Sequence, residues 1–147
     1  MILKSKDAVE IRGLPLAQTH TGKIFYVSNA TTGLTKNSIV GNDSNNGSQK
    51  KPFATIDYAI GRCTVDRGDI ILVAPGHSET ITGAAAIDLD VDGITLMGLG
   101  HGDKQAQVLF NNAAATVEVN ADNVTIRNMR FTSTITTVAV GLDIVDG

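Results

Sequence analysis

Thirteen consecutive residues of this chain occur twice in nearly the same pattern, thirty residues apart. Ile87–Leu99 and Val117–Met129 largely match apolar with apolar and acidic or amide with acidic or amide. In Ile87-Asp88-Leu89-Asp90-Val91-Asp92 the two kinds alternate, so a strand here has one apolar and one polar face. A turn pair, Asp92-Gly93 or Asp122-Asn123, then leads into a second short strand. Repeats too short to bury their own apolar face predict coils stacked in a parallel β-solenoid.

The composition fits such narrow coils and excludes several functions. Of the 147 residues, 42% are hydrophobic but only 4% aromatic, which suits one domain of stacked coils better than a sandwich of large side chains. A net charge of −3 with scattered Lys and Arg argues against a nucleic-acid partner. Because Cys63 is the one cysteine, no internal disulfide or ordinary zinc site is expected, and we interpret Cys63 as a small buried apolar residue.

The sequence shows no targeting signal. Met1–Asp7 contains no long apolar segment, and no window reaches the ~18 apolar residues of a membrane span, so we expect a soluble protein without signal peptide or membrane partner. An extracellular type of fold without an export signal is what a virion protein released by lysis would show.

The N-terminal part has the weakest pattern. Residues 1–22 predict an extended arm that cannot fold on itself and docks on a neighbour, with a short strand at Ala8–Ile11, and Lys23–Ser28 predicts the first strand of the body. In the loop Asn29–Lys51, the run Gly41–Ser48 is rich in side chains that bond their own backbone. Its oxygens make calcium a candidate ligand, although the bidentate Glu of an EF-hand loop is missing.

A short helix is predicted next, followed by a strand. Ile56, Ala59, Ile60 and Cys63 follow helical spacing within Pro52–Cys63, and Thr55 or a preceding residue is a candidate cap. We expect this helix to plug the N-terminal end of the solenoid, since terminal units need a capping surface. Arg67–His77 predicts a strand whose four apolar residues leave open which pair points inward.

These segments together resemble a known family. The resemblance rests on Phe25-Tyr26-Val27, Gly41–Gly47, Pro52–Ile56 with Ala59-Ile60, and Gly68–Gly76. Their order and spacing resemble the N-terminal part of pectin-lyase-like right-handed parallel β-helix proteins, from Lys23 to about Phe131. The same opening is found on polysaccharide lyases, hydrolases, surface proteins, and phage tailspikes or other virion appendages, so the resemblance implies fold more than function.

The resemblance implies an all-β fold, a short right-handed parallel β-helix with an N-terminal capping α-helix. We expect an arm at 1–22 and a β-helix domain at 23–147, with the cap at 23–66 and the coils at 67–147. Members of the family usually have many coils, whereas this sequence supplies about three. Gly141–Gly147 resembles Ile87–Gly93 and looks like the beginning of another coil, so either the chain is a fragment or another subunit covers that end.

The outward residues of the two repeats form a predicted acidic ladder, with Asp143 as a possible continuation. Its members are Asp88, Asp90, Asp92, Glu118, Asn120 and Asp122. The leading interpretation is a solvated face that keeps the solenoid soluble. A cation-binding or subunit-contact role comes second, and a pair of catalytic carboxyls third. We assign no catalytic or metal-binding residue.

The remaining polar residues are assigned structural roles. A lyase of the resembled family would use an Arg or Lys base, yet for Arg127 and Arg130 we favour salt bridges to the ladder. His20, His77 and His101 are expected to be isolated loop residues without a Ser or Cys nucleophile. Asn111-Asn112 and Asn128 are candidates for amide ladders between coils.

The leading hypothesis is a non-enzymatic structural protein of a bacteriophage virion. It would decorate a capsid or build a tail appendage as a homotrimer, with other virion proteins as partners. The alternative is the N-terminal part of a polysaccharide lyase or hydrolase, or of a glycan-binding tailspike, with a surface polysaccharide as partner.

Overall fold

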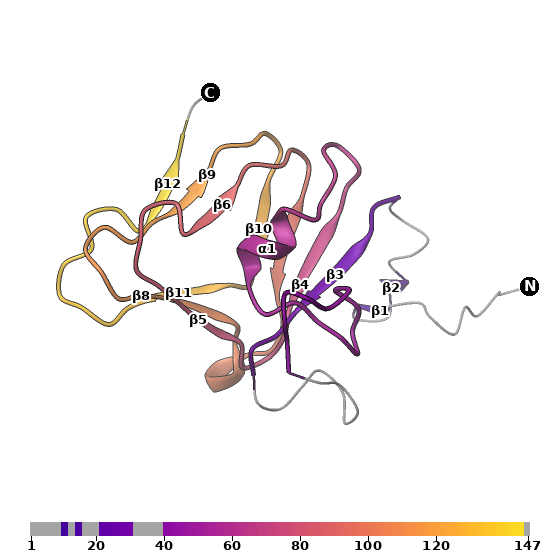
Figure 1. Cartoon of the computed structure of the whole chain (residues 1–147), viewed down its shortest axis with the longest axis horizontal. Helices are drawn as coiled ribbons and strands as arrows, with labels where there is room; N and C mark the ends of the chain where they lie inside the picture. Colours follow the sequence, from indigo (N-terminus) through magenta and orange to yellow (C-terminus); the bar gives the residue numbers. More distant parts are fainter. Residues whose placement is uncertain (1–9, 12–13, 16–20, 31–39, 146–147) are drawn as a thin grey trace, which may run out of the picture.

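Three parallel β-sheets make up most of the structure, a computed structural model that describes residues 10–11, 14–15, 21–30 and 40–145 (Figure 1). The first sheet has the strand order β3-β4-β7-β10, the second β5-β8-β11 and the third β6-β9-β12. The strands of these sheets are β3 (Ile24–Val27), β4 (Ile70–Val73), β5 (Ser78–Ile81), β6 (Ile87–Leu89), β7 (Thr95–Gly98), β8 (Gln107–Phe110), β9 (Val117–Val119), β10 (Thr125–Arg127), β11 (Arg130–Ser133) and β12 (Leu142–Ile144).

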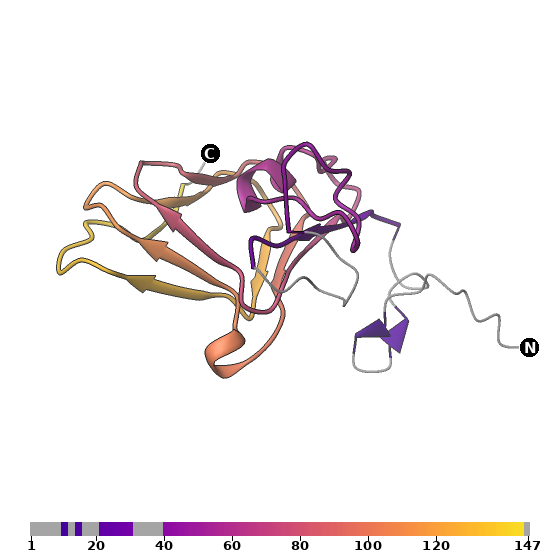
Figure 2. The ribbon, with the colours of Figure 1, turned by 60° about the horizontal axis from the view of Figure 1, so that its bottom comes forward.

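Successive stretches of chain stack on one another. The trios β4-β5-β6, β7-β8-β9 and β10-β11-β12 each place one strand in every sheet, and all pairs between them are parallel. Figure 2 shows the three trios as adjacent layers. The fold is therefore mostly β, with parallel strands stacked in three sheets, and each trio is called a coil below.

The register confirms the thirty-residue offset. Ile87 pairs with Val117 and Leu89 with Val119, and in the first sheet Thr95 pairs with Thr125. The turn pairs also behave as expected, because Gly93 and Asn123 both have positive φ, at 73° and 57°. Leu142–Ile144 forms a third rung beside Val117–Val119, as its resemblance to Ile87–Leu89 indicated.

The core lies between the three sheets, and a smaller apolar cluster lies outside the first. Ile71 and Val73 of β4 point into the main core. Ile70 and Leu72 point the other way and pack with Tyr26 on the outer face. Both faces of β4 are buried, which is why the alternation of its sequence could not assign an inner pair.

The predicted cap is present as the short helix α1 (Ile56–Ile60). Thr55 is its N-cap, with the side-chain oxygen accepting from the Tyr58 N–H, and the buried residues of α1 are Ile56, Ala59 and Ile60. It packs against β3, β4 and β6, beside the first coil (Figure 1). The helix ends well before Cys63 because Gly61 forms its C-cap.

Part of the predicted arm folds on itself, contrary to expectation. β1 (Glu10–Ile11), the described half of the predicted strand at Ala8–Ile11, pairs antiparallel with β2 (Leu14–Pro15). The rest of the arm up to His20 lies outside the described residues, as do 31–39 and 146–147. A 3-10 helix, η2 (Gly102–Lys104), connects β7 to β8.

Candidate functional site

The acidic ladder lies on the third sheet at Asp88 and Glu118, and its other members, Asp90, Asp92, Asn120 and Asp122, follow strands β6 and β9. Asp88 pairs in register with Glu118, and Glu118 with Asp143, while the alternating apolar residues of β6 and β9 face the core. Adjacent strands are about 4.8 Å apart, so these three carboxylates stand side by side. The structure thus brings the predicted row together and extends it to Asp143.

Several ladder side chains bind neighbouring coils or their own strand. Asn120 Nδ2 donates to Asp88 Oδ1 at 2.7 Å, and the Asp122 N–H donates to Asp92 Oδ1 at 2.8 Å. Glu118 Oε1 accepts from Thr116 Oγ1 at 3.1 Å. Hydrogen bonds to ionised carboxylates are about twice as strong as neutral ones, so these contacts stabilise the stacking.

A further carboxylate, Asp57 of α1, joins the ladder and was not predicted. The backbone N–H of Asp88 donates to Asp57 Oδ1 at 3.1 Å. Partial burial of the carboxylate raises the pKa of Asp57, and the charges of Asp88, Asp90 and Glu79 raise it further, against the lowering effect of that hydrogen bond. The placement of the helix beside the first coil was the signal that could have identified this residue.

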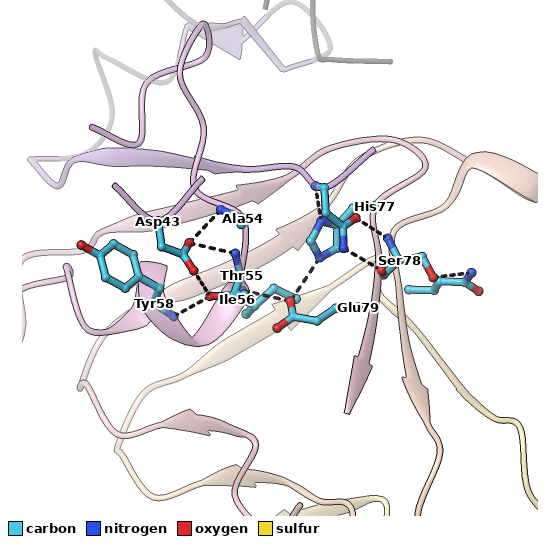
Figure 3. A network of polar contacts seen from close by, with 10 residues as sticks. Asp43, Ala54, Thr55, Ile56, Tyr58, His77, Ser78 and Glu79 are labelled. Atoms are coloured by element: carbon cyan, nitrogen blue, oxygen red, sulfur yellow. Dashed lines mark hydrogen bonds and ion pairs between the residues drawn. The ribbon is translucent and has the colours of Figure 1, made fainter. Parts of the chain in front are cut away.

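The cap contains a second polar network, centred on Asp43 (Figure 3). Asp43 Oδ1 accepts from the backbone N–H groups of Ala54 and Thr55 at 2.8 and 3.1 Å, and Oδ2 accepts from Thr55 Oγ1 at 3.0 Å. The carboxylate therefore ties the Gly41–Ser48 run to the start of α1. Across the described ranges, no group of three or more His, Cys, Asp or Glu residues could hold a metal ion.

His77 lies between β4 and β5, outside the strands, as predicted for a loop residue, but it is buried and hydrogen-bonded rather than isolated. It has no exposed surface, and its Nδ1 accepts from the Asn29 backbone N–H at 3.0 Å. Because Nδ1 is the acceptor, Nε2 carries the hydrogen directed at Glu79 Oε2, 3.2 Å away. Glu79 Oε2 also accepts from the Ile56 N–H at 3.0 Å, so this network joins β3, the first coil and α1 (Figure 3).

Asp69 holds together a different part of the cap. This fully buried carboxylate accepts from Arg67 Nε and Nη2 at 2.7 and 2.6 Å and from the backbone N–H groups of Lys23 and Thr64 at 2.7 and 2.8 Å. Burial acts to raise the pKa of Asp69, but these bonds outweigh it, so the pKa lies below its ordinary value. The arrangement is structural, since every bond fixes backbone or the neighbouring Arg67.

The predicted salt bridges between the arginines and the ladder are not formed. Arg130 Nη2 instead donates to the Gly102 carbonyl at 2.7 Å, and Arg127 is exposed on β10. Both arginines lie on strands of the other two sheets, away from the ladder. Within the part of the chain that the structure describes, Arg67 and Asp69 form an ion pair, and His77 and Glu79 share the hydrogen bond described above.

The remaining predicted residues mostly serve the scaffold. Asn128 Nδ2 donates to the carbonyls of Gly98 and Gly100 in the preceding coil, and Asn111 Oδ1 accepts from Thr134 Oγ1 in the following one. Asn128 Oδ1 also accepts from the side-chain amide of Gln105 at 3.3 Å, so an amide–amide bond links neighbouring coils at Asn128, whereas Asn111 bonds a hydroxyl. His101 is exposed, and Cys63 packs partly buried against the core, where burial raises the pKa of its thiol to about 12.

Two cavities border these elements. One, of about 300 Å³, lies at the cap. Its lining residues are Lys23, Phe25, Asn45, Asn46, Phe53, Gly61 and Arg62. The other, of about 670 Å³, lies beside β12 and the turn after β9. Its lining residues are Asp92, Val119, Asn120, Ala121, Asp122, Ile144 and Val145.

Comparisons with known proteins identify a family. The family model described as "Protein of unknown function (DUF1565)" matches residues 39–141, the segment that contains Gly41–Ser48, α1 and nearly all the stacked strands. That family is associated with parallel β-helix, pectin-lyase-like proteins. No curated protein and no solved structure matches the chain. No helix among the described residues is long and apolar enough to cross a membrane. The match covers more than half of the sequence, and the chain therefore belongs to the DUF1565 family.

Proposed function

We propose that the three sheets, each built from stacked parallel strands, form the faces of a short right-handed parallel β-helix. The support for the coil arrangement is that each trio of strands contributes to all three sheets in parallel. The support for the hand is general, since about 98% of crossovers between parallel strands of one sheet are right-handed.

This β-helix acts as a non-enzymatic structural protein of a bacteriophage virion, as capsid decoration or as a tail appendage. The observation that carries the proposal is the use of ladder side chains within the scaffold, where Asp88 and Asp92 accept from the following coil and Glu118 from Thr116. Carboxylates that hydrogen-bond neighbouring strands stabilise the scaffold, and a structural component of a virus particle requires such a stable scaffold. Three copies, together with other virion proteins, make up the assembly.

Native mass spectrometry combined with a turnover assay tests this role. The expected result is a homotrimer that releases no reducing or unsaturated ends from acidic or neutral polysaccharides. A monomer at micromolar concentration, or sustained release of such ends, contradicts it.

A carbohydrate-active or glycan-binding tailspike is the second candidate, favoured by one observation. Asp57 has a raised pKa and lies against Asp88, whose neighbour in register is Glu118. Glycoside hydrolysis uses two carboxyl groups about 5 to 9 Å apart, of which the general acid has a raised pKa. If this candidate is right, Asp57→Asn abolishes turnover, whereas Asp103→Asn, a matched change in the exposed η2, preserves it.

A further inference from the structure

The Gly41–Ser48 run contains the one Asn-Gly pair of the sequence, Asn46-Gly47. Asn46 is exposed, whereas Gly47 is buried and has a positive φ of 73°. A Cβ at Gly47 would overlap the ring of Phe53, so a residue with a side chain does not fit at this position. The fold therefore requires a glycine after Asn46, and this glycine leaves its own peptide nitrogen sterically accessible.

The side-chain carbonyl of Asn46 already has a hydrogen-bond donor. Its Oδ1 accepts from the backbone N–H of Ser48 at 3.1 Å, which bends the side chain back along its own backbone. No described residue accepts the Gly47 N–H. A donor on a carbonyl oxygen stabilises the negative charge that develops there when a nucleophile adds to the carbonyl carbon. The chain thus presents an electrophile, Asn46 Cγ, beside a nucleophile, the Gly47 nitrogen.

A carboxylate formed at position 46 would lie near two cations. Asn46 borders the 300 Å³ cavity at the cap together with Lys23 and Arg62. Neither cation forms an ion pair with a described Asp or Glu. A negative charge that appears beside them is stabilised, most strongly at low ionic strength.

We propose that Asn46 is a site of spontaneous deamidation, which gives the cavity at the cap a negative charge after the chain has folded. The Gly47 nitrogen bonds to Asn46 Cγ, and the side-chain nitrogen takes up the proton of the Gly47 N–H and leaves as ammonia. Water then opens the cyclic imide. Cleavage between Cγ and the Gly47 nitrogen gives aspartate with the original backbone, whereas cleavage between the main-chain carbonyl carbon and that nitrogen gives isoaspartate.

The fold selects between the two products. Isoaspartate directs the backbone through Cβ and so adds one backbone atom before Gly47. The Gly47 carbonyl accepts from the Tyr26 N–H at 2.9 Å, and Gly47 has no spare room beside the Phe53 ring, so the added atom would disturb both contacts. Aspartate keeps the backbone and places its carboxylate beside Lys23 and Arg62. The folded chain should therefore yield mainly aspartate.

Intact mass and peptide mapping of the full chain, stored in mildly alkaline buffer, test the site. Asn42 and Asn112 are internal controls, because they accept the same kind of backbone bond but have no glycine after them. Conversion at Asn46 should be at least about tenfold faster than at either control. Isoaspartate should exceed aspartate in the denatured chain, and the order should reverse in the folded chain. Conversion no faster than at the controls, or an excess of isoaspartate in the folded chain, overturns the inference.

Thermal unfolding tests the charge pairing directly. Asn46→Asp should raise the unfolding midpoint by about 1–4 °C at low ionic strength. In a chain that also carries Lys23→Gln and Arg62→Gln, the same change should give no rise. Lys104→Gln with Arg127→Gln removes a matched pair of exposed cations outside the cavity and should preserve the rise. A rise that survives the loss of both cavity cations, or no rise in the wild-type background, overturns the charge pairing on which the choice of product rests.

Discussion

Equivalent core positions are buried at one end of the stacked coils and exposed at the other. Ile87, Val117 and Leu142 form one ladder through the three coils, and their exposed fractions are 0%, 1% and 44%. At the first coil, α1 and the Asp43 and His77 networks close the end. At the third coil no described element covers the strands. The comparison shows that an apolar alternation specifies the strand and its inner face, whereas burial depends on what lies over the end.

The largest expected effect tests this contrast within a single ladder, that of Leu89, Val119 and Ile144. Leu89 is fully buried, so Leu89→Ala should lower the free energy of unfolding by about 2–5 kcal/mol. Ile144→Ala, at 74% exposure, should change it by less than about 1 kcal/mol. Urea denaturation of both variants measures the difference, and equal losses would show that the third coil is covered as well as the first.

The second largest effect is expected when the buried carboxylate of Asp69 is replaced. Asp69→Asn leaves buried N–H groups short of an acceptor and frees Arg67, at about 1–3 kcal/mol for each unsatisfied group. Asp90→Asn, at an exposed ladder position, is the control and should be nearly neutral.

The effect of Asp69 should also depend on pH with a definite sign. Its folded pKa is depressed, so its contribution is fully present above the unfolded pKa of about 3.9 and is lost as pH falls through the folded pKa. The stability difference between wild type and Asp69→Asn should therefore shrink below about pH 4. A difference that stays constant down to acidic pH would count against the Arg67–Asp69 pairing.

A smaller effect is expected at His77. His77→Phe removes the acceptor for the Asn29 N–H and the donor to Glu79, which should cost about 1–3 kcal/mol. Thermal unfolding should shift downward, and the amides of Asn29 and Ile56 should exchange faster. His101→Phe, at an exposed position, should leave both measurements unchanged.

The smallest predicted effect concerns Asp57, where α1 meets the ladder. Its raised pKa means that its contribution to stability is present below the unfolded pKa and is lost as pH rises through the folded value. Carbon-detected NMR titration should place the pKa of Asp57 above 3.8, and Asp88→Asn should lower it by removing a nearby charge. An ordinary pKa in the wild type would remove the support for a carboxyl pair.

The sequence predicts the repeat far better than it predicts the cap. The thirty-residue register of Ile87 and Val117 follows from local alternation, because stacked coils place equivalent residues side by side. His77 could not be placed in the same way, since its partners are Asn29 and Glu79, and Glu79 in turn accepts from Ile56. Such contacts depend on how the first strand, the first coil and the helix converge.

The arginines illustrate the same limit. Arg130 is close in sequence to Glu118, but the chain turns into another sheet between them, so the side chain bonds the Gly102 carbonyl instead. Sequence proximity predicts contacts along a strand and fails across a corner. Asp57 was missed for the opposite reason, because it is distant in sequence from Asp88 and adjacent in space.

Residue-resolved hydrogen exchange of the unliganded protein tests most directly the claim that parallel coils are closed at one end and open at the other. Amides of β6 and β9 should exchange slowly, near the rate set by global unfolding, and those of β12 should exchange orders of magnitude faster. Protection of β12 equal to that of β6 would contradict the open end, and rapid exchange throughout β6 and β9 would contradict the stacked register.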